Sequence, residues 1–358
     1  MYKSTKYITN KLSFALIIPL FLTSCFQQKH DTNLAFITTE NDGVKVIDLN
    51  SFEIIEHIKD LQKPRGVAVS HDGKTLVTAN KNNASLTLVD LQDHQSRKEV
   101  EVGENPEFIR LYGDKIFVST EPSSQGKPGE HDSKLDDDDD DDLPAQIQVV
   151  DLNTQKILQT IEAGIETEGI EFTYDKKNII VTNESDSTVS VHDIQTGKKI
   201  HTIDLLKYGK RPRGIKRSPQ KKMYAVTMEH SNNVILLSES YEVIDTIATG
   251  NNPYGVVFSA DGDKLFVLAS KSKELNVFDV NTRERVHSQP LNANRCWHMT
   301  FTPNNKDILI ACGGSDEVLV LDVQSYKEKK RLPVTGKPWG IVTYPKTFGS
   351  LDEPVYSY

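Results

Sequence analysis

The chain has 358 residues, 37% of them hydrophobic and 26% charged, with 51 acidic against 42 basic side chains. This composition excludes general disorder and provides material for a large core. The acidic surplus excludes nucleic acid as the main partner, because phosphates are bound through Lys and Arg side chains that displace their counterions.

The first 24 residues have the pattern of an export signal. Lys3, Lys6 and Lys11 precede an apolar run over residues 12–22, which is too short for a comfortable membrane span. The run ends in Leu-Thr-Ser-Cys, and this resembles the lipobox of bacterial lipoproteins, in which the cysteine is acylated and becomes the first mature residue. An ordinary signal peptide cut elsewhere, or an uncleaved anchor, is the alternative.

Cleavage before Cys25 would leave 39 basic against 51 acidic residues, a charge of −12. We expect a lipid on Cys25, a short tether over residues 25–33 and attachment to the membrane of the cell envelope. Phe26 follows the cysteine, and by resemblance to the sorting rules of Gram-negative bacteria this favours the outer membrane.

From residue 34 onward the chain is built of repeats. Each has an anchor, in most cases a Pro, a variable residue, a Gly and an aliphatic residue, and successive anchors lie 41 to 45 residues apart except for one interval of 61. The anchors begin at Pro64, Pro106, Thr167, Pro212, Pro253, Cys296 and Pro338. Each interval holds four short β-rich runs, such as "GIEFT", "NIIVTN", "TVSVHDI" and "KKIHTI". Seven units predict an all-β, seven-bladed β-propeller with four antiparallel strands per blade.

The two ends of the repeat region complete each other. After Pro338 only one strand, "GIVTY", remains, whereas three strands, "LAFITT", "GVKVIDL" and "FEIIEHI", precede the first anchor. Three N-terminal strands and one C-terminal strand therefore make the seventh blade, so the ring closes without a free edge. We expect the propeller over residues 34–346 and a tail over residues 347–358.

The long interval contains an acidic insert, residues 122–145, between the second and third strands of blade 2. A run of like charges repels itself, so disorder is expected there. Weak calcium binding is the alternative, although the spaced Asp and the turn Gly of a dedicated calcium loop are absent. Its ligands would be Asp136, Asp137, Asp138, Asp139, Asp140, Asp141 and Asp142.

The repeats resemble those of the YVTN family of propellers, whose strand ending appears here as Val181-Thr182-Asn183 and approximately in residues 77–80. The succession of anchors is similar to that of the propeller proteins associated with pyrroloquinoline-quinone-dependent alcohol catabolism. The resemblance covers residues 34–346 and implies a role as carrier or chaperone for a quinone cofactor or an alcohol dehydrogenase. It implies no established activity.

All seven anchors should lie around one mouth of the central channel, because antiparallel order puts the loops between blades and the loops after the second strands on one face. The variable anchor residues, in ring order, are Arg65, Glu107, Glu168, Arg213, Tyr254, Trp297 and Trp339. The ends of the second strands add Glu40, Asn80, Glu121, Glu184, Glu229, Ser270 and Gly313. An aromatic wall beside orienting charges indicates a binding site for a protein or small molecule. The structural alternative is that Arg65 pairs with Glu107, and Arg213 with Glu168, only to neutralise the mouth.

These patterns favour a monomeric binding or interaction scaffold, with binding expected ahead of catalysis and no cofactor beyond weakly bound calcium. The alternative is a lactonase-type hydrolase in which Glu184, Glu229 and Arg213 do acid/base or electrostatic work. Motifs for covalent haem, zinc proteolysis, a nucleophile elbow and a phosphate loop are absent from the sequence. A joint soft-metal site at residues 296–299 is not expected, because neighbouring strand residues face opposite ways.

Cys296 and Cys312 flank a turn centred on residue 304. Antiparallel strands would place the two cysteines side by side, and export would allow oxidation, so a disulfide is expected. Two buried thiols are the alternative, because only some cross-strand positions bring the β-carbons close enough.

Overall fold

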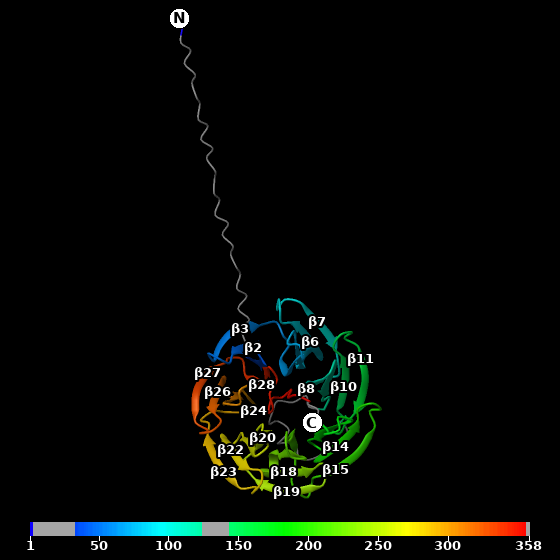
Figure 1. Cartoon of the computed structure of the whole chain (residues 1–358). Coiled ribbons are helices and arrows are strands. Elements are labelled where there is room, and N and C mark those ends of the chain that lie inside the picture. Colours follow the sequence, from blue (N-terminus) through cyan, green and yellow to red (C-terminus); the bar gives the residue numbers. More distant parts are fainter. Residues whose placement is uncertain (3–32, 124–142, 356–358) are drawn as a thin grey trace. The chain divides into compact units, whose positions relative to one another are not determined.

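The computed structural model describes residues 1–2, 33–123 and 143–355. Over these residues the chain forms seven sheets of four antiparallel strands, arranged as blades around a central channel (Figure 1). The predicted fold class is therefore confirmed. Cys25 and the aspartates of residues 136–142 lie outside the described residues. Within the described part, no helix has the length and apolar character needed to cross a membrane.

The blades are numbered by the order of their anchors, and the strands of each run from the channel outward. Blade 1 contains β4 (Pro64–Val69), β5 (Thr75–Asn80), β6 (Ser85–Asp90) and β7 (Arg97–Glu101). Blade 2 contains β8 (Pro106–Tyr112), β9 (Lys115–Thr120), β10 (Gln146–Asp151) and β11 (Ile157–Glu162). Blade 3 contains β12 (Thr167–Phe172), β13 (Asn178–Asn183), β14 (Thr188–Asp193) and β15 (Lys199–Asp204). Blade 4 contains β16 (Pro212–Arg217), β17 (Met223–Met228), β18 (Asn233–Ser238) and β19 (Val243–Ala248).

Blade 5 contains β20 (Pro253–Phe258), β21 (Lys264–Ala269), β22 (Glu274–Asp279) and β23 (Arg285–Pro290). Blade 6 contains β24 (Cys296–Phe301), β25 (Asp307–Cys312), β26 (Glu317–Asp322) and β27 (Glu328–Pro333). Blade 7 contains β28 (Pro338–Tyr344), β1 (Leu34–Thr39), β2 (Gly43–Asp48) and β3 (Glu53–Ile58). Two short 3-10 turns, η1 (Lys81–Asn83) and η3 (Glu229–Ser231), follow β5 and β17.

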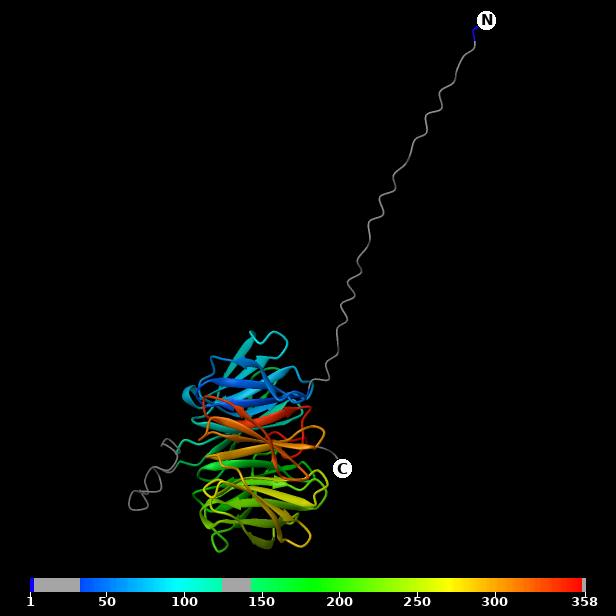
Figure 2. The ribbon, with the colours of Figure 1, turned by 90° about the vertical axis from the view of Figure 1, so that its left-hand side faces the viewer.

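The core lies between neighbouring blades, which Figure 2 shows from the side. Alternating apolar residues of β6, such as Leu86 and Leu88, pack with Ile109 and Val118 of blade 2. The inner strand β4 is buried along its whole length, whereas the outer strand β15 buries only one of its six residues. Strand alternation therefore supplies one apolar face to each adjacent blade, and solvent covers only the rim.

The ring closes as the sequence predicts. In blade 7, β28 pairs antiparallel with β1, so that Leu34 faces Tyr344 and Ile37 faces Ile341. The first and last strands of the propeller thus share one sheet, and their pairing closes the ring.

The anchors mark an irregularity at the start of every inner strand. In all seven blades the pairing of the first and second strands shifts register at the anchor. The anchor glycine is needed because a β-carbon on Gly66 would lie 2.1 Å from the carbonyl oxygen of Glu107 in the next blade. Gly255 has the same relation to the carbonyl oxygen of Trp297, at 2.5 Å. The glycine therefore lets adjacent blades approach each other beside the channel.

The C-terminal segment does not hang free as a tail. After β28 the chain turns into the end of the channel remote from the anchors, where residues 350–353 are at most 7% exposed (red segment near the centre of Figure 1). Asp352 accepts from the backbone N–H of Leu111 at 2.9 Å, and Lys216 donates to the carbonyl oxygen of Ser350 at 2.6 Å. The segment after the expected boundary at residue 346 is therefore packed against the propeller.

Candidate functional site

Arg65 of blade 1 joins two neighbouring blades at the mouth of the channel. Its Nε donates to Glu40 of blade 7 at 2.9 Å, and its guanidinium also forms an ion pair with Glu107 of blade 2. Lys337 donates to the second oxygen of Glu40 at 2.5 Å. The side chain of Arg65 is only 8% exposed, so these charges depend on one another for compensation.

Arg213 of blade 4 is the centre of a second network. It donates to Glu168 of blade 3 at 2.9 Å and to the Tyr254 hydroxyl of blade 5 at 2.7 Å. It also donates to Glu184 at 3.1 Å and forms an ion pair with Glu229. Burial would lower the pKa of Arg213, but the surrounding carboxylates raise it well above its usual value. Of the residues named for the hydrolase alternative, Glu184 and Glu229 therefore both contact Arg213.

Both ion pairs of the structural alternative, Arg65 with Glu107 and Arg213 with Glu168, are present. Nε and Nη1 of Arg65, and all three nitrogens of Arg213, already have partners within the protein. A ligand could use these engaged N–H groups only by replacing a carboxylate, since each N–H donates to one strong acceptor at a time.

The aromatic half of the ring is largely buried. Tyr254 and Trp297 are each 7% exposed, and Trp339 is 2% exposed. Arg213 lies over the ring of Tyr254 at 4.6 Å, and Arg65 lies near that of Trp339 at 5.8 Å. The two halves of the anchor ring are thus packed together, and an open aromatic wall is not formed.

Trp297 explains an irregularity of the repeat. Its indole lies over Gly313, where a β-carbon would be 2.3 Å from Cζ3 of the ring. Several other blades carry a Glu at this position, and blade 6 has no room for one. The ammonium group of Lys337 lies 5.5 Å from the centroid of the Trp297 ring.

Two side chains inside the channel were missed by the sequence analysis. Phe108 and His298 occupy the anchor position at which the other five blades have Gly. Their rings meet in the channel with centroids 5.5 Å apart, and Trp339 packs on both. The signal was visible in the sequence, because a repeat that drops its glycine at a crowded axis must place a side chain there.

His298 is a neutral imidazole in this setting. Burial lowers its pKa well below the usual value, and Lys216, Arg213 and Arg65 add to the effect. Its Nε2 has no hydrogen-bond partner among the described residues. Met299 points instead into the core between the blades, so residues 296–299 do not form a joint soft-metal site.

The carboxylates beneath the mouth are deeply buried. Glu121 and Glu184 are each 1% exposed. Burial raises the pKa of Glu121 well above its usual value, and Glu168 and Glu184 add to this. Burial also raises the pKa of Glu184, against the opposing effect of Arg213. Acidic groups with such a pKa can hold a proton or attract a cation.

The structure corrects one of the seven residues that were predicted to lie at the mouth from the ends of the second strands. In six blades the backbone N–H of the predicted residue donates to the carbonyl of the residue before the anchor, but in blade 1 Lys81 makes this bond, to Lys63, at 3.1 Å. Asn80 is the last residue of β5, and its side chain bonds to Ser85 and Thr87 within the blade. The mouth therefore has a cation where an amide was expected.

The residue immediately before each anchor has a left-handed backbone conformation. All seven have φ between 49° and 65° although none is glycine, and the carbonyl of each accepts the bond just described. They are Lys63, Asn105, Glu166, Arg211, Asn252, Arg295 and Lys337. Asn105 and Glu166 are buried, whereas the other five are partly or fully exposed. We call the four cations of this set, the exposed Arg295 and the partly exposed Lys63, Arg211 and Lys337, the collar.

A small cavity lies between the mouth and the C-terminal segment. About 30 Å³ of it is open to the centres of water-sized molecules, which is room for about two waters. Its walls include Phe108, Glu168, Arg213, Lys216, Tyr254, His298 and Leu351. The space is too small for a substrate unless the surrounding side chains move.

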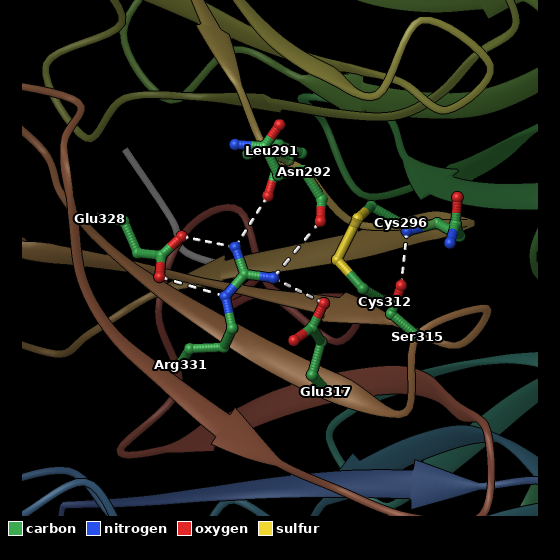
Figure 3. Close-up of a disulfide and its surroundings, with 9 residues drawn as sticks. Leu291, Asn292, Cys296, Cys312, Ser315, Glu317, Glu328 and Arg331 are labelled. Carbon is green, nitrogen blue, oxygen red and sulfur yellow. Dashed lines mark hydrogen bonds and ion pairs between the residues drawn. A yellow bond between two sulfur atoms is a disulfide. The ribbon is translucent and has the colours of Figure 1, made fainter.

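A disulfide joins Cys296 of β24 to Cys312 of β25 (Figure 3). The two cysteines are cross-strand partners at the position where the neighbouring blade pairs Pro253 with Ala269. Nearby, Arg331 donates to Glu317 and Glu328 and to the carbonyl oxygens of Leu291 and Asn292. The bridge and the arginine together hold the strands of blade 6 at the anchor end.

Comparison with known proteins agrees with the propeller fold. The model of the cytochrome D1 heme domain family matches residues 143–270. No curated protein matches the chain in sequence.

Three solved structures illustrate the likeness. A putative 6-phosphogluconolactonase from Bacteroides uniformis is 15% identical with a TM-score of 0.69, over 87% of this chain and 99% of that one. The periplasmic gluconolactonase of Pseudomonas aeruginosa is 16% identical with a TM-score of 0.69, over 87% and 98%. A dihydro-heme d1 dehydrogenase is 17% identical with a TM-score of 0.64, over 87% and 75%. At such identities the likeness shows the fold alone.

The channel of this chain does not fit a haem. Phe108, His298 and Trp339 fill the axis, the C-terminal segment closes one end, and the remaining cavity holds about two waters. A tetrapyrrole would have to displace these buried groups. The partial match to a haem domain therefore indicates shared repeat architecture.

Proposed function

We propose that this protein is a binding protein of the cell envelope whose anchor face takes a small anionic molecule, such as a sugar carboxylate. One observation carries the proposal, namely the collar of Lys63, Arg211, Arg295 and Lys337 around the mouth. Two of these cations, Lys63 and Arg295, make no ion pair with the described residues.

The fold requires the backbone conformation of the collar residues, but it does not require their charged side chains. The left-handed conformation and the carbonyl hydrogen bond recur in all seven blades, with Asn and Glu as well as Lys and Arg. Lys and Arg make up 42 of the 358 residues, a proportion that predicts about one cation among seven positions. Four cations on one face of an acidic chain point to selection for binding an anion.

Acidic residues of the same loops are engaged locally. Asp316 accepts from the backbone N–H of Lys337 at 2.7 Å, and Asp186 accepts from that of Ile165 at 2.9 Å. These contacts orient the two carboxylates toward backbone donors of the neighbouring loops between blades. A carboxylate ligand can therefore approach Lys63 and Arg295 directly, whereas Arg211 and Lys337 already pair with glutamates.

Titration with D-gluconate tests the proposal. The chain has two tryptophans, Trp297 and Trp339, and both belong to the mouth, so intrinsic fluorescence reports on this face. At low salt we expect saturable binding of gluconate that weakens as salt screens the collar. Glucose, which lacks the charge, is the matched control ligand.

The variant pair for this test avoids the buried network. Lys63→Gln with Arg295→Gln should weaken gluconate binding at least tenfold without changing the melting temperature. Lys98→Gln, on the exposed outer strand β7, should have no effect. Equal binding of glucose and gluconate, or unchanged binding in the double variant, would refute the proposal.

Lactone hydrolysis is the second candidate. It is supported by the direct contacts of Arg213 with Glu184 and Glu229 and by the lactonase names of two structures with the same fold. Glucono-δ-lactone should then open faster than in buffer alone, and Glu229→Gln should lower that rate at least tenfold. Glu242→Gln, an exposed change remote from the channel, is the control. A rate equal to that of buffer removes this candidate.

A further inference from the structure

Three buried carboxylates meet beneath the mouth between blades 2 and 3. One oxygen each from Glu107, Glu121 and Glu168 lies within 4.8 Å of the other two. All three residues are at most 5% exposed. Glu107 and Glu168 come from adjacent anchors, and Glu121 follows the second strand of blade 2, so the packing of blade 2 against blade 3 brings the three together.

Two oxygens of this cluster lack hydrogen-bond partners. Oε1 of Glu121 and Oε2 of Glu168 are buried and accept no hydrogen bond from the described residues. Buried acceptors are nearly always satisfied, and those that are not commonly mark a bound water or ion. This observation is independent of the clustering, and it points to a ligand that supplies positive charge.

The existing ion pairs do not place a positive charge between the three carboxylates. Glu107 is paired with Arg65 of blade 1, and Glu168 is paired with Arg213 of blade 4. The remaining carboxylates of the mouth also have partners, such as Lys337 on Glu40. Within the described residues, Glu121 makes no ion pair.

We propose that Glu107, Glu121 and Glu168 bind one divalent cation, most favourably Ca²⁺. The inference does not rest on the proposed function, because the cation would lie beneath the collar and would hold blades 2 and 3 together whatever binds above it.

The geometry and chemistry of the ligands favour Ca²⁺ over other ions. Ca²⁺–oxygen distances are about 2.3–2.6 Å, so two ligands on opposite sides of the ion are about 4.6–5.2 Å apart. Separations of at most 4.8 Å between the three oxygens are compatible with one such ion. Mg²⁺ binds at about 2.0–2.1 Å and demands near-octahedral geometry, which carboxylates from two blades meet less readily than the flexible coordination of Ca²⁺. Ligands with oxygen only, without Cys or His, also disfavour zinc and copper.

The experiment uses the mature chain with residues 136–142 changed from Asp to Ser, which removes the acidic insert as a competing site. After treatment with EDTA, calorimetric titration with CaCl₂ should show one ion per chain. The melting temperature should rise by several degrees in saturating Ca²⁺ relative to EDTA, and MgCl₂ should bind at least tenfold more weakly.

Glu121→Gln keeps the shape of the side chain and removes its charge. We expect this variant to fold and to lose the Ca²⁺-induced shift in melting temperature. Glu242→Gln, an exposed carboxylate remote from the channel, should keep both the ion and the shift. A crystal structure in CaCl₂ locates the ion directly. The proposal is overturned if the insert-free chain binds no Ca²⁺ below 1 mM (~4 kcal/mol of binding), if Glu121→Gln binds it normally, or if the ion lies elsewhere.

Discussion

The imidazole of His298 packs against the indole of Trp339 with ring centroids 4.4 Å apart. The two residues belong to adjacent blades 6 and 7, and Phe108 of blade 2 closes the cluster from across the channel. The axis of this propeller is therefore a packed core. It ties the last blade to distant parts of the ring in addition to the strand pairing that closes it.

Trp339 should contribute to stability as a core residue does. Trp339→Ala removes a buried indole and leaves a cavity, so it should lower the free energy of unfolding by about 3–5 kcal/mol. Urea denaturation followed by circular dichroism measures the loss. Ile55→Ala, at a side chain that is 56% exposed, should change it by less than about 0.5 kcal/mol. A loss below 1 kcal/mol at Trp339 (a fraction of the ~3 kcal/mol expected) would mean that the channel is open and hydrated.

Glu353 should make the C-terminal segment sensitive to pH. Burial raises its pKa to about 7 and Glu171 adds to this, whereas Lys216 and Arg110 oppose it; Asp352 lies beside it in the chain. An unfolded Glu titrates near 4.5, so the folded carboxyl holds its proton more tightly. This contribution to stability is complete below pH 4.5 and is lost as the pH rises through about 7.

Glu353→Gln isolates that contribution, because Gln mimics the protonated carboxyl at every pH. The melting temperatures of the two proteins should differ little at pH 5, and the difference should grow towards pH 8, where the variant should be clearly the more stable one. The lowered pKa of Glu171, about 2, acts only below pH 4.5 and does not interfere. A constant difference between the two proteins from pH 5 to pH 8 would contradict the assignment.

The disulfide between Cys296 and Cys312 should be present in exported protein. Alkylation without reductant, followed by intact mass measurement, should find neither of these thiols free. Because the bridge closes a loop of 16 residues, Cys312→Ser should lower the free energy of unfolding by about 3 kcal/mol. Detection of two alkylated thiols in the exported chain would mean that the cysteines are simply buried.

Lipid attachment at Cys25 remains a prediction from the sequence. Cys25→Ala should release soluble protein or block processing, because the thioether is the only point at which the lipid can join. Metabolic labelling with a fatty-acid analogue measures this, and the wild-type chain should carry the label. Equal labelling of both proteins would show that the lipobox interpretation is wrong.

The sequence by itself determined the number of blades, the closure of the ring and the face on which the anchors gather. These features follow from local rules, since strand alternation, repeat spacing and antiparallel order act over a few dozen residues at most. The cross-strand position of Cys296 and Cys312 followed from the same register. The pairs Arg65 with Glu107 and Arg213 with Glu168 could be named as an alternative, because their blades are adjacent.

Only the tertiary structure decided which side chains meet at the channel axis. Residues from non-adjacent blades share one small volume there. Phe108 and His298 meet there because two repeats lack the glycine. The C-terminal segment fills the other end, where Glu353 pairs with Lys216 and Asp352 with Arg110. The burial of Trp339 and the meeting of Glu121 with Glu168 likewise depend on how the blades pack against one another. Such contacts join residues up to 243 positions apart, and no pattern within a repeat encodes which side chains will share that space.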